Sequence, residues 1–351
     1  MLRKSLLAVY AVLPFAAAAS RAADTSPLPP PVYTVSRSFP LPGSGGWDYL
    51  ALDGGGARLF VSRGDRVDVV ETSSGRVAGT IANTAGVHGI AIAPALKRGF
   101  TSNGRSNSVS VFELDTLKLV QEVPVSGKNP HAILFEPRHN YLITANGGSS
   151  NLSVIDAGTL QPVATIPLPG TPEFMVTDDA GIVYVNTEGE PGKLAVLDTK
   201  SLTVKATWPL PECSNPTGLA LDSTHHRLFS VCANQVMAVT DSVSGRQAAR
   251  VVIGRGPDAV AFDPDLSMIF SSNGLDGTLT VIHEESPDEY KVLATVTTQV
   301  SARTMALDPA AHKLYLAAAK LGATPPATDV EPHPRPSIVP DTFAILVAQP
   351  K

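Results

Sequence analysis

Six ionisable side chains recur along the 351-residue chain at intervals of 40 to 45 residues or their multiples. If the fold brings them together, the imidazoles and carboxylates are suitable ligands for zinc or a similar divalent ion, which could activate water. Alternatively, one imidazole could act as a general base oriented by a carboxylate, while a guanidinium stabilises an oxyanion. The recurring positions hold Asp48, His88, His131, Glu173, Thr217, Asp258 and Arg303, of which only Thr217 is not ionisable.

The residue types divide between these two chemistries. His88, His131 and Glu173 are the candidate metal ligands, and a divalent metal ion is the one cofactor that the sequence suggests. For general-base chemistry, His88 or His131 would be the base, and Asp48 or Glu173 would orient it. The sequence contains no closely spaced ligand motif such as HExxH that would give further support to a metal site. The remaining alternative is a solvated polar rim whose side chains pair with one another.

The interval between these positions is the length of an internal repeat. Seven repeats start at residues 47, 87, 130, 172, 216, 257 and 302. Each begins with a short apolar run such as GIAIAP (89–94), followed by a second run such as YLITAN (141–146). A third run such as TLTVIHEES (278–286) and a fourth such as PVATIPL (162–168) come after turn residues. Such β-branched runs are strands, and a 40-odd-residue period is that of a four-stranded propeller blade.

The last repeat is one strand short. After TFAILVAQ (342–349) the chain ends, whereas VYTVSRSFPLPG (32–43) before the first repeat resembles PVATIPLPG (162–170). We therefore expect segment 32–43 to supply the fourth strand of the last blade and to close the ring. The sequence predicts an all-β fold, a single seven-bladed β-propeller over 24–351, with the recurring ionisable residues around the mouth of the central channel.

These repeats resemble those of the YVTN-type β-propeller family, which are exported proteins with 40-odd-residue repeats. That family is related in fold to the propeller lactonases and to the cytochrome cd1 haem propeller. The resemblance covers about 32–350, and the nearest match to the YVTN signature is IVYVNTEG (182–189). It implies the fold and export, and it implies no particular chemistry.

The first 23 residues have the pattern of a signal peptide. Arg3 and Lys4 precede an apolar run over 6–19, which is shorter than the ~20 residues that span a bilayer. We expect a periplasmic or secreted protein with no membrane span after cleavage. Cleavage after Ala22 also removes Arg21 and changes the net charge from −5 to −8. Such an acidic protein is a poor candidate for nucleic-acid binding.

The chain has only two cysteines, Cys213 and Cys232. In an oxidising compartment this pair predicts a disulfide, and two unpaired buried thiols are the alternative. The repeat pattern places both on the face of the channel mouth, where the fourth and fifth blades meet. No CxxCH occurs, so nothing supports haem attachment.

A Pro-rich segment, 322–341, replaces the tight turn between the second and third strands of the last blade. Loops of this length in compact domains are usually functional or disordered. We expect it over or beside the channel mouth, where it could complete a site as a lid; a solvated tether is the alternative. The candidate lid residues are Asp329, Glu331, His333 and Arg335.

Two further groups of polar residues are interpreted as structural. Asparagines end four of the second strands, where turn chemistry and left-handed backbone favour them: Asn103, Asn146, Asn186 and Asn273. Three histidines are placed in turns on the opposite face and expected to be solvated: His225, His226 and His312.

The leading functional hypothesis is an exported binding or scaffold protein that uses the channel face to hold a small ligand, a metal ion or a periplasmic partner protein. The alternative is a metal-assisted hydrolase or lyase acting on a small ester or lactone, by analogy with the propeller lactonases. A companion role to periplasmic redox enzymes has only fold and compartment in its favour. We expect a monomer.

Overall fold

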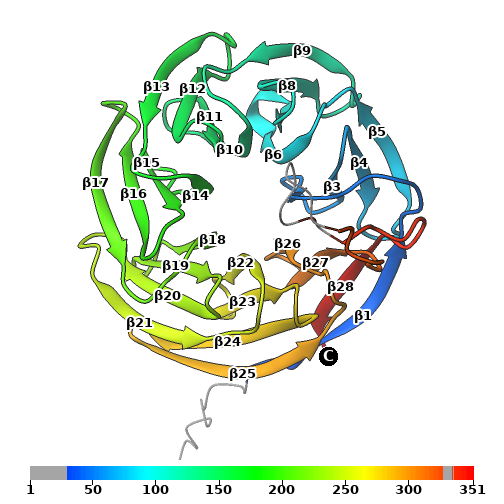
Figure 1. Cartoon of the computed structure of the whole chain (residues 1–351), viewed down its shortest axis with the longest axis vertical. Helices are drawn as coiled ribbons and strands as arrows, with labels where there is room; N and C mark the ends of the chain where they lie inside the picture. The colour runs from blue at the N-terminus through cyan, green and yellow to red at the C-terminus, as the bar shows by residue number, and fades with distance from the viewer. Residues whose placement is uncertain (1–29, 327–333, 335) are drawn as a thin grey trace, which may run out of the picture. The chain divides into compact units, whose positions relative to one another are not determined.

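In the part of the chain that the structure describes, 28 short strands form seven sheets of four antiparallel strands each, arranged as a ring (Figure 1). The second and third strands of each blade are the most deeply buried, because both of their faces are covered by neighbouring blades; Arg58–Arg63 has five consecutive buried residues, for example. The outermost strands alternate between exposed and half-buried residues, as in Thr203–Leu210. This pattern confirms the seven-bladed, four-stranded propeller expected from the repeats.

The computed structural model describes residues 30–326, 334 and 336–351. The proposed signal peptide, 1–23, and the four candidate lid residues, Asp329, Glu331, His333 and Arg335, lie outside the described residues. Within the described part of the chain, no helix is long and apolar enough to cross a membrane. A single turn of 3-10 helix, η1 (Pro94–Leu96), joins two strands of the second blade.

The blades follow one another along the chain, from the innermost strand to the outermost. The first blade consists of β2 (Leu50–Leu52), β3 (Arg58–Arg63), β4 (Arg66–Glu71) and β5 (Val77–Ala82). The second consists of β6 (Val87–Ala93), β7 (Arg98–Asn103), β8 (Ser108–Glu113) and β9 (Leu119–Pro124). The third consists of β10 (Pro130–Glu136), β11 (Tyr141–Asn146), β12 (Asn151–Asp156) and β13 (Pro162–Pro167). The next two consist of β14 (Pro172–Thr177), β15 (Ile182–Thr187), β16 (Gly192–Asp198) and β17 (Thr203–Leu210); and β18 (Pro216–Asp222), β19 (Arg227–Cys232), β20 (Val236–Asp241) and β21 (Gln247–Val252). The last two consist of β22 (Pro257–Asp263), β23 (Met268–Asn273), β24 (Thr278–Ser286) and β25 (Glu289–Thr297); and β26 (Thr304–Asp308), β27 (Lys313–Ala318), β28 (Ala344–Pro350) and β1 (Tyr33–Pro40).

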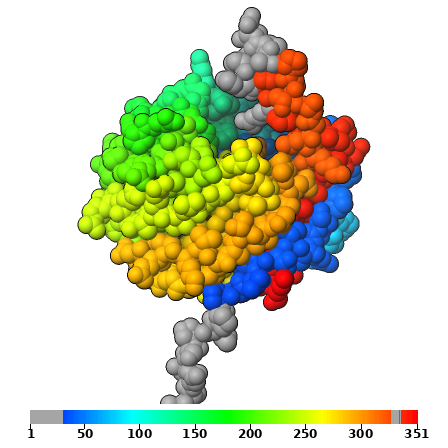
Figure 2. Space-filling model, turned by 60° about the horizontal axis from the view of Figure 1, so that its bottom comes forward, coloured from blue at the N-terminus to red at the C-terminus, as the bar shows by residue number. Residues whose placement is uncertain are grey.

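The N-terminal strand closes the ring, as the sequence predicts. β1 pairs antiparallel with β28 from Tyr33 opposite Pro350 to Pro40 opposite Ala344. Its two aromatic residues point inward: Tyr33 packs edge-on against Phe270 with ring centroids 4.7 Å apart, and Phe39 is buried in the core between the last and first blades. Figure 2 shows this strand, in blue, beside the sixth blade, in orange.

The four strand-ending asparagines have a different role from the one expected. They lie inside strands β7, β11, β15 and β23 and are completely buried, and none has a left-handed backbone. Instead, their amides bind other buried polar groups; Asn103 Nδ2, for example, donates to the hydroxyls of Ser108 and Ser110 on the next strand. Asn186 differs, since its Nδ2 donates to two backbone carbonyls of the next blade. The recurring Asn therefore satisfies buried polar groups and does not form the turns.

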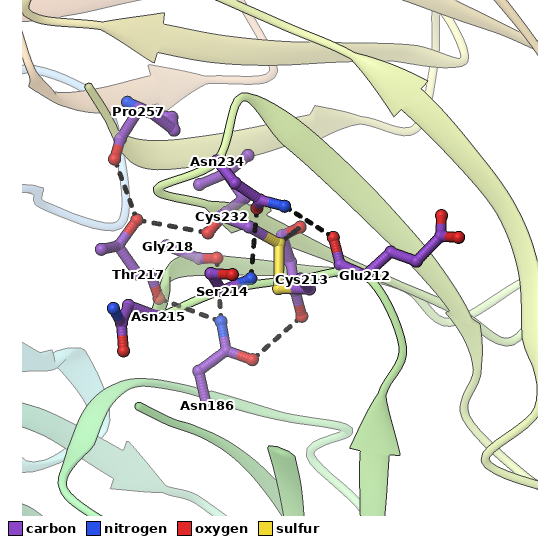
Figure 3. The surroundings of a disulfide bond; sticks show 12 residues. Asn186, Glu212, Cys213, Ser214, Asn215, Thr217, Gly218, Cys232, Asn234 and Pro257 are labelled. Atoms are coloured by element: carbon purple, nitrogen blue, oxygen red, sulfur yellow. Dashed lines mark hydrogen bonds between the residues drawn. A yellow bond between two sulfur atoms is a disulfide. The ribbon is translucent and has the colours of Figure 1, made fainter. Parts of the chain in front are cut away.

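A disulfide joins Cys213, in the linker between the fourth and fifth blades, to Cys232 at the end of β19 (Figure 3). Around it, Asn186 Nδ2 donates to the carbonyls of Thr217 and Gly218, at 2.9 and 3.0 Å. The disulfide thus holds the linker directly before Thr217, one of the recurring channel-mouth positions.

Removing the disulfide should destabilise this junction. We expect the Cys213→Ala/Cys232→Ala variant to lose about 3 kcal/mol of unfolding free energy, because the bond closes a chain segment with a separation of 19 residues. Chemical denaturation of the oxidised protein and the variant measures the difference, and the reduced wild type is the control. A loss below about 1 kcal/mol would show that the linker is held by its hydrogen bonds alone.

Candidate functional site

The recurring polar residues share one local structure at the start of the innermost strands. His88, His131, Glu173, Thr217 and Asp258 are the second residues of β6, β10, β14, β18 and β22. In each case the pairing with the next strand is irregular just after this position. Such bulges redirect a side chain, here toward the channel mouth.

Hydroxyl groups on the second strands fix these irregular positions. Ser62 Oγ accepts the N–H of Asp48 at 3.0 Å. Ser102 Oγ accepts the N–H of Gly89 at 2.8 Å and donates to the carbonyl of His131 on the neighbouring blade. One serine therefore binds two successive blades at the point where their histidines emerge.

Asp48 is the centre of the site, with two imidazoles on the same carboxylate oxygen. His88 Nδ1 lies 2.7 Å from Asp48 Oδ2, and His131 Nε2 lies 3.2 Å from the same atom. The two imidazole rings are 4.6 Å apart between centroids. Residues from three different blades thus meet at one point. No described residue hydrogen-bonds to His88 Nε2, which lies against the backbone of Gly104.

The other nitrogen of His131 faces a different pair of groups. The hydroxyl of Tyr49 lies 3.2 Å from His131 Nδ1 and donates to the carbonyl of Glu173 at 3.2 Å. The carboxylate oxygen Oε2 of Glu173 lies 3.5 Å from the same nitrogen. Sequence reasoning missed Tyr49, because no other repeat has a tyrosine at this position. Its only signal was an aromatic hydroxyl next to Asp48.

Arg303 and Asp258 complete the network on the opposite side of Asp48. Arg303 forms an ion pair with Asp258, and its NH2 group lies 3.8 Å from Asp48 Oδ1 and donates to the carbonyl of Trp47 at 3.2 Å. The hydroxyl of Thr217 donates to the carbonyl of Pro257 at 3.0 Å. The structure therefore joins all six ionisable positions in one network, with Thr217 bound to the adjacent backbone.

The charges of this network are strongly coupled. Burial would raise the pKa of Asp48, but hydrogen bonds from His131 and His88 and the charge of Arg303 hold it well below its ordinary value. Burial opposes protonation of His131, but the hydrogen bond to Asp48 and the charges of Asp48 and Glu173 raise its pKa to about 9. Burial raises the pKa of Glu173 to about 7, against the opposing charge of His131. At neutral pH His131 is thus an imidazolium.

These contacts decide which residues could hold a metal ion. One ligand atom from each of Asp48, His88 and His131 lies within 4.8 Å of the others, so the carboxylate nearest both imidazoles is Asp48 and not the expected Glu173. Glu173 faces the far side of the His131 ring. Because His131 has acceptors at both nitrogens, a metal ion would have to displace a proton from it. The geometry therefore favours a hydrogen-bonded centre over a metal centre.

The charge on His131 gives a direct test of the network. We expect Asp48→Asn to lower the pKa of His131 from about 9 toward the ordinary ~6.5, because the main group that stabilises the imidazolium loses its charge. A histidine whose pKa is raised by folding contributes stability that is complete below about pH 6.5 and is lost as the pH rises through 9. The variant should therefore lose more stability at pH 6 than at pH 10, where only the contacts of Asp48 with His88 and Arg303 are lost.

Titration of the imidazole resonances by NMR, with denaturation at both pH values, measures these effects. Glu173→Gln is the matched control, since it removes a more distant charge and should lower the pKa of His131 less. An unchanged pKa of His131 in Asp48→Asn would contradict the contact between the two residues.

A cavity of about 480 Å³ opens beside this network. Its base contains Arg303 and Asp258, and most of its wall is apolar, from Trp47, Leu275, Val300, Leu321, Pro336 and Ile338. Leu321, Pro336 and Ile338 belong to or border the described base of the Pro-rich segment, where Leu321 and Ile338 form an isolated antiparallel bridge. The described ends of this segment, 322–326 and 336–341, thus lie beside the channel mouth, as its place in the repeat predicts.

Comparison with known proteins found one matching family model over part of the chain. The chain resembles a lactonase propeller. The model is described as "Lactonase, 7-bladed beta-propeller" and matches residues 63–165, which include His88 and His131. Because this is less than half of the chain, it describes a similarity of that part of the ring. A comparison with curated proteins found no match.

Solved structures show the same fold at low identity. Hydrazine synthase of Kuenenia stuttgartiensis is 18% identical, with a TM-score of 0.70 over 78% of this chain and 92% of that one. The structure of U3-55K is 11% identical, with a TM-score of 0.72 over 88% and 97% of the two chains. The WD40 repeats of RRP9 are 11% identical, with a TM-score of 0.74 over 92% and 99%. Such likeness shows that the fold is a propeller, and the chemistry has to be inferred from the residues of the site.

Proposed function

We propose that the protein is an exported propeller that binds a small organic molecule at the channel mouth. The cavity beside Arg303 and Asp258 supports this proposal best. Its volume is in the range of small-molecule sites, and an apolar wall with a few charged groups at the base is the usual composition of such sites. Arg303 favours a ligand with an apolar body and an acidic group, because the guanidinium can donate to a carboxylate. Export rests on the signal-like pattern of residues 1–23, and membership of the YVTN-type family rests on the repeats.

Trp47 can report on binding directly, since it lines the cavity and the chain has only one other tryptophan, Trp208. In a Trp208→Phe background, we expect the emission of Trp47 to change saturably with at least one member of a panel of small carboxylic acids and lactones. The matched comparison is Asp258→Asn/Arg303→Gln, which removes both charges together and leaves no unpaired one. Loss of acid binding in that variant supports the proposal, whereas no response to any acid, or equal binding by the variant, contradicts it.

A second function, hydrolysis of a small ester or lactone, is favoured by the pair of His88 and Asp48. A carboxylate that holds Nδ1 of an imidazole leaves Nε2 as a potential base for a water molecule. The similarity of residues 63–165 to the lactonase model is consistent with this chemistry. Hydrolysis through His88 does not need a metal ion, which the contacts of His131 make the less favoured route.

If the protein hydrolyses lactones, we expect His88→Gln to lower kcat/KM by about 10²–10⁴-fold, the usual contribution of a general base. Acid release from simple γ- and δ-lactones in weakly buffered solution is the measurement. His226→Asn is the control, because this residue lies in a turn at φ 57°, which asparagine also adopts. Equal activity of His88→Gln and the wild type would exclude His88 as the base.

A further inference from the structure

A second cluster of metal-binding side chain types lies between the fifth and sixth blades, at the strand ends away from the channel mouth. Asp222 ends β18, His225 lies in the turn that follows, and Glu284 lies near the end of β24. His225 Nδ1 lies 2.8 Å from Asp222 Oδ2 and 3.6 Å from Glu284 Oε2. One ligand atom of each residue lies within 4.8 Å of the others. His225 is therefore not simply solvated, as its place in a turn had predicted.

The two carboxylates are buried and incompletely satisfied. Asp222 is 2% and Glu284 4% exposed. Neither Asp222 Oδ2 nor Glu284 Oε2 accepts an aligned hydrogen bond from the described residues, since the 2.8 Å contact of Asp222 Oδ2 with His225 Nδ1 lacks hydrogen-bond geometry. Their other oxygens are fixed, since Asp222 Oδ1 accepts the N–H of Thr224 at 2.9 Å and Glu284 Oε1 accepts the hydroxyl of Tyr290 at 3.1 Å. Two buried carboxylates that face each other repel, so a proton or a cation is needed between them.

The third and fourth blades contain a similar arrangement with two changes: a glutamate in place of Asp222 and a threonine in place of Glu284. Glu136 ends β10 and His139 lies in the following turn, in the places of Asp222 and His225. There His139 Nδ1 lies 3.3 Å from Glu136 Oε2 and 2.9 Å from the hydroxyl of Thr199. Thr199 and Glu284 are equivalent, because each donates its backbone N–H at 2.9 Å to a turn carbonyl of its own blade. The hydroxyl of Thr199 thus lies beside His139, whereas the carboxylate of Glu284 lies at the equivalent place beside His225.

Glu284 is exceptional among the blades that share this backbone hydrogen bond. The other five residues at this position are neutral: Thr72, Leu114, Ala157, Thr199 and Ser242. A charged residue in a buried position that the repeat fills with neutral side chains has a high desolvation cost. A bound ion explains why a carboxylate is found there.

We propose that Asp222, His225 and Glu284 bind one divalent transition-metal ion. Two carboxylate oxygens and one imidazole nitrogen suit zinc or manganese, and the ion would neutralise both buried charges. The hydrogen bonds from Thr224 and Tyr290 orient the two carboxylates, as partners of metal ligands commonly do. The half-exposed His225 leaves the ion accessible from solvent, with room for water as a further ligand. Because the ligands come from two blades, the ion would link the fifth blade to the sixth.

Zinc binding by Glu284→Thr tests this site, since the variant has one carboxylate, one imidazole and one threonine hydroxyl, as the cluster of Glu136, His139 and Thr199 does. Tag-free mature protein is freed of metal by dialysis against EDTA and titrated with zinc chloride at pH 7.5 by calorimetry. We expect one equivalent of zinc to bind the wild type and to raise its melting temperature. In Glu284→Thr the affinity should fall at least ~10-fold and the thermal shift should disappear.

Two further variants separate this site from the channel mouth and from a general loss of folding. His88→Ala should keep the equivalent of zinc, whereas Glu284→Gln, which preserves size, should lose it. Equal zinc binding by the wild type and both Glu284 variants would overturn the proposal. So would the absence of zinc binding in the wild type.

Discussion

Replacing Arg63 with methionine is expected to lower the free energy of unfolding by about 3–5 kcal/mol. Arg63 ends β3 and is completely buried. Its guanidinium donates to the carbonyls of Leu41 and Gly43, both at 3.2 Å, and lies 3.8 Å above the ring centroid of Phe343. Methionine fills a similar volume and leaves those carbonyls without their donor, which is the costly part of the change. Denaturation by urea at neutral pH measures the loss.

Arg66 provides a matched control for this prediction. Arg66 lies three residues from Arg63, and both guanidinium groups contact the carboxylate of Asp68. The side chain of Arg66, however, is 26% exposed. Arg66→Ala should therefore cost about 1 kcal/mol or less, as partly solvated ion pairs do. Equal losses in the two variants would mean that Arg63 acts as an ordinary surface charge and not as the link between the closing segment and the first blade.

Deleting the closing strand should have the largest effect on the protein. A chain without residues 1–40 is compared with the mature chain from residue 24 that the signal-like pattern predicts. It loses all seven residue pairs between β1 and β28 and the buried rings of Tyr33 and Phe39. The edge of β28 would then be open to pairing with other chains. We expect this variant to be recovered mainly as aggregate, with no cooperative unfolding transition. Size-exclusion chromatography and thermal unfolding of the soluble fraction measure both effects.

The control for the deletion is a chain that lacks only residues 24–29, which precede the strand. It should elute and unfold as the full mature chain does. Adding a synthetic peptide of residues 30–43 to the longer deletion should restore part of the cooperative transition, because the lost contacts are all made by this segment. A longer deletion that unfolds at the temperature of the full mature chain would show that strand closure contributes little to stability.

The fold was predictable because a propeller repeats its local pattern. Each blade needs the same four apolar runs and the same turns, so seven copies with 40- to 45-residue spacing indicate the ring even though no single blade is decisive. The closing strand was predictable for the same reason, since 32–43 repeats the pattern of 162–170. The asparagines were misread because a polar residue at a strand end usually marks a turn. Here the amides of Asn103, Asn146 and Asn273 bind buried hydroxyls on the next strand, and that of Asn186 binds carbonyls of the next blade.

The sequence by itself determined which positions surround the channel mouth, because equivalent positions in a closed ring must lie on one circle. Only the tertiary structure decided which of them touch. It paired both imidazoles with Asp48, placed Tyr49 against His131, and joined Asp222 and His225 to Glu284 across a blade junction. These contacts depend on side chains of different blades that are about 40 to 80 residues apart in sequence, and no repeat pattern specifies them. The burial of Arg63 was equally unpredictable from the repeats, since Leu41 and Phe343, which contact it, lie near opposite ends of the chain.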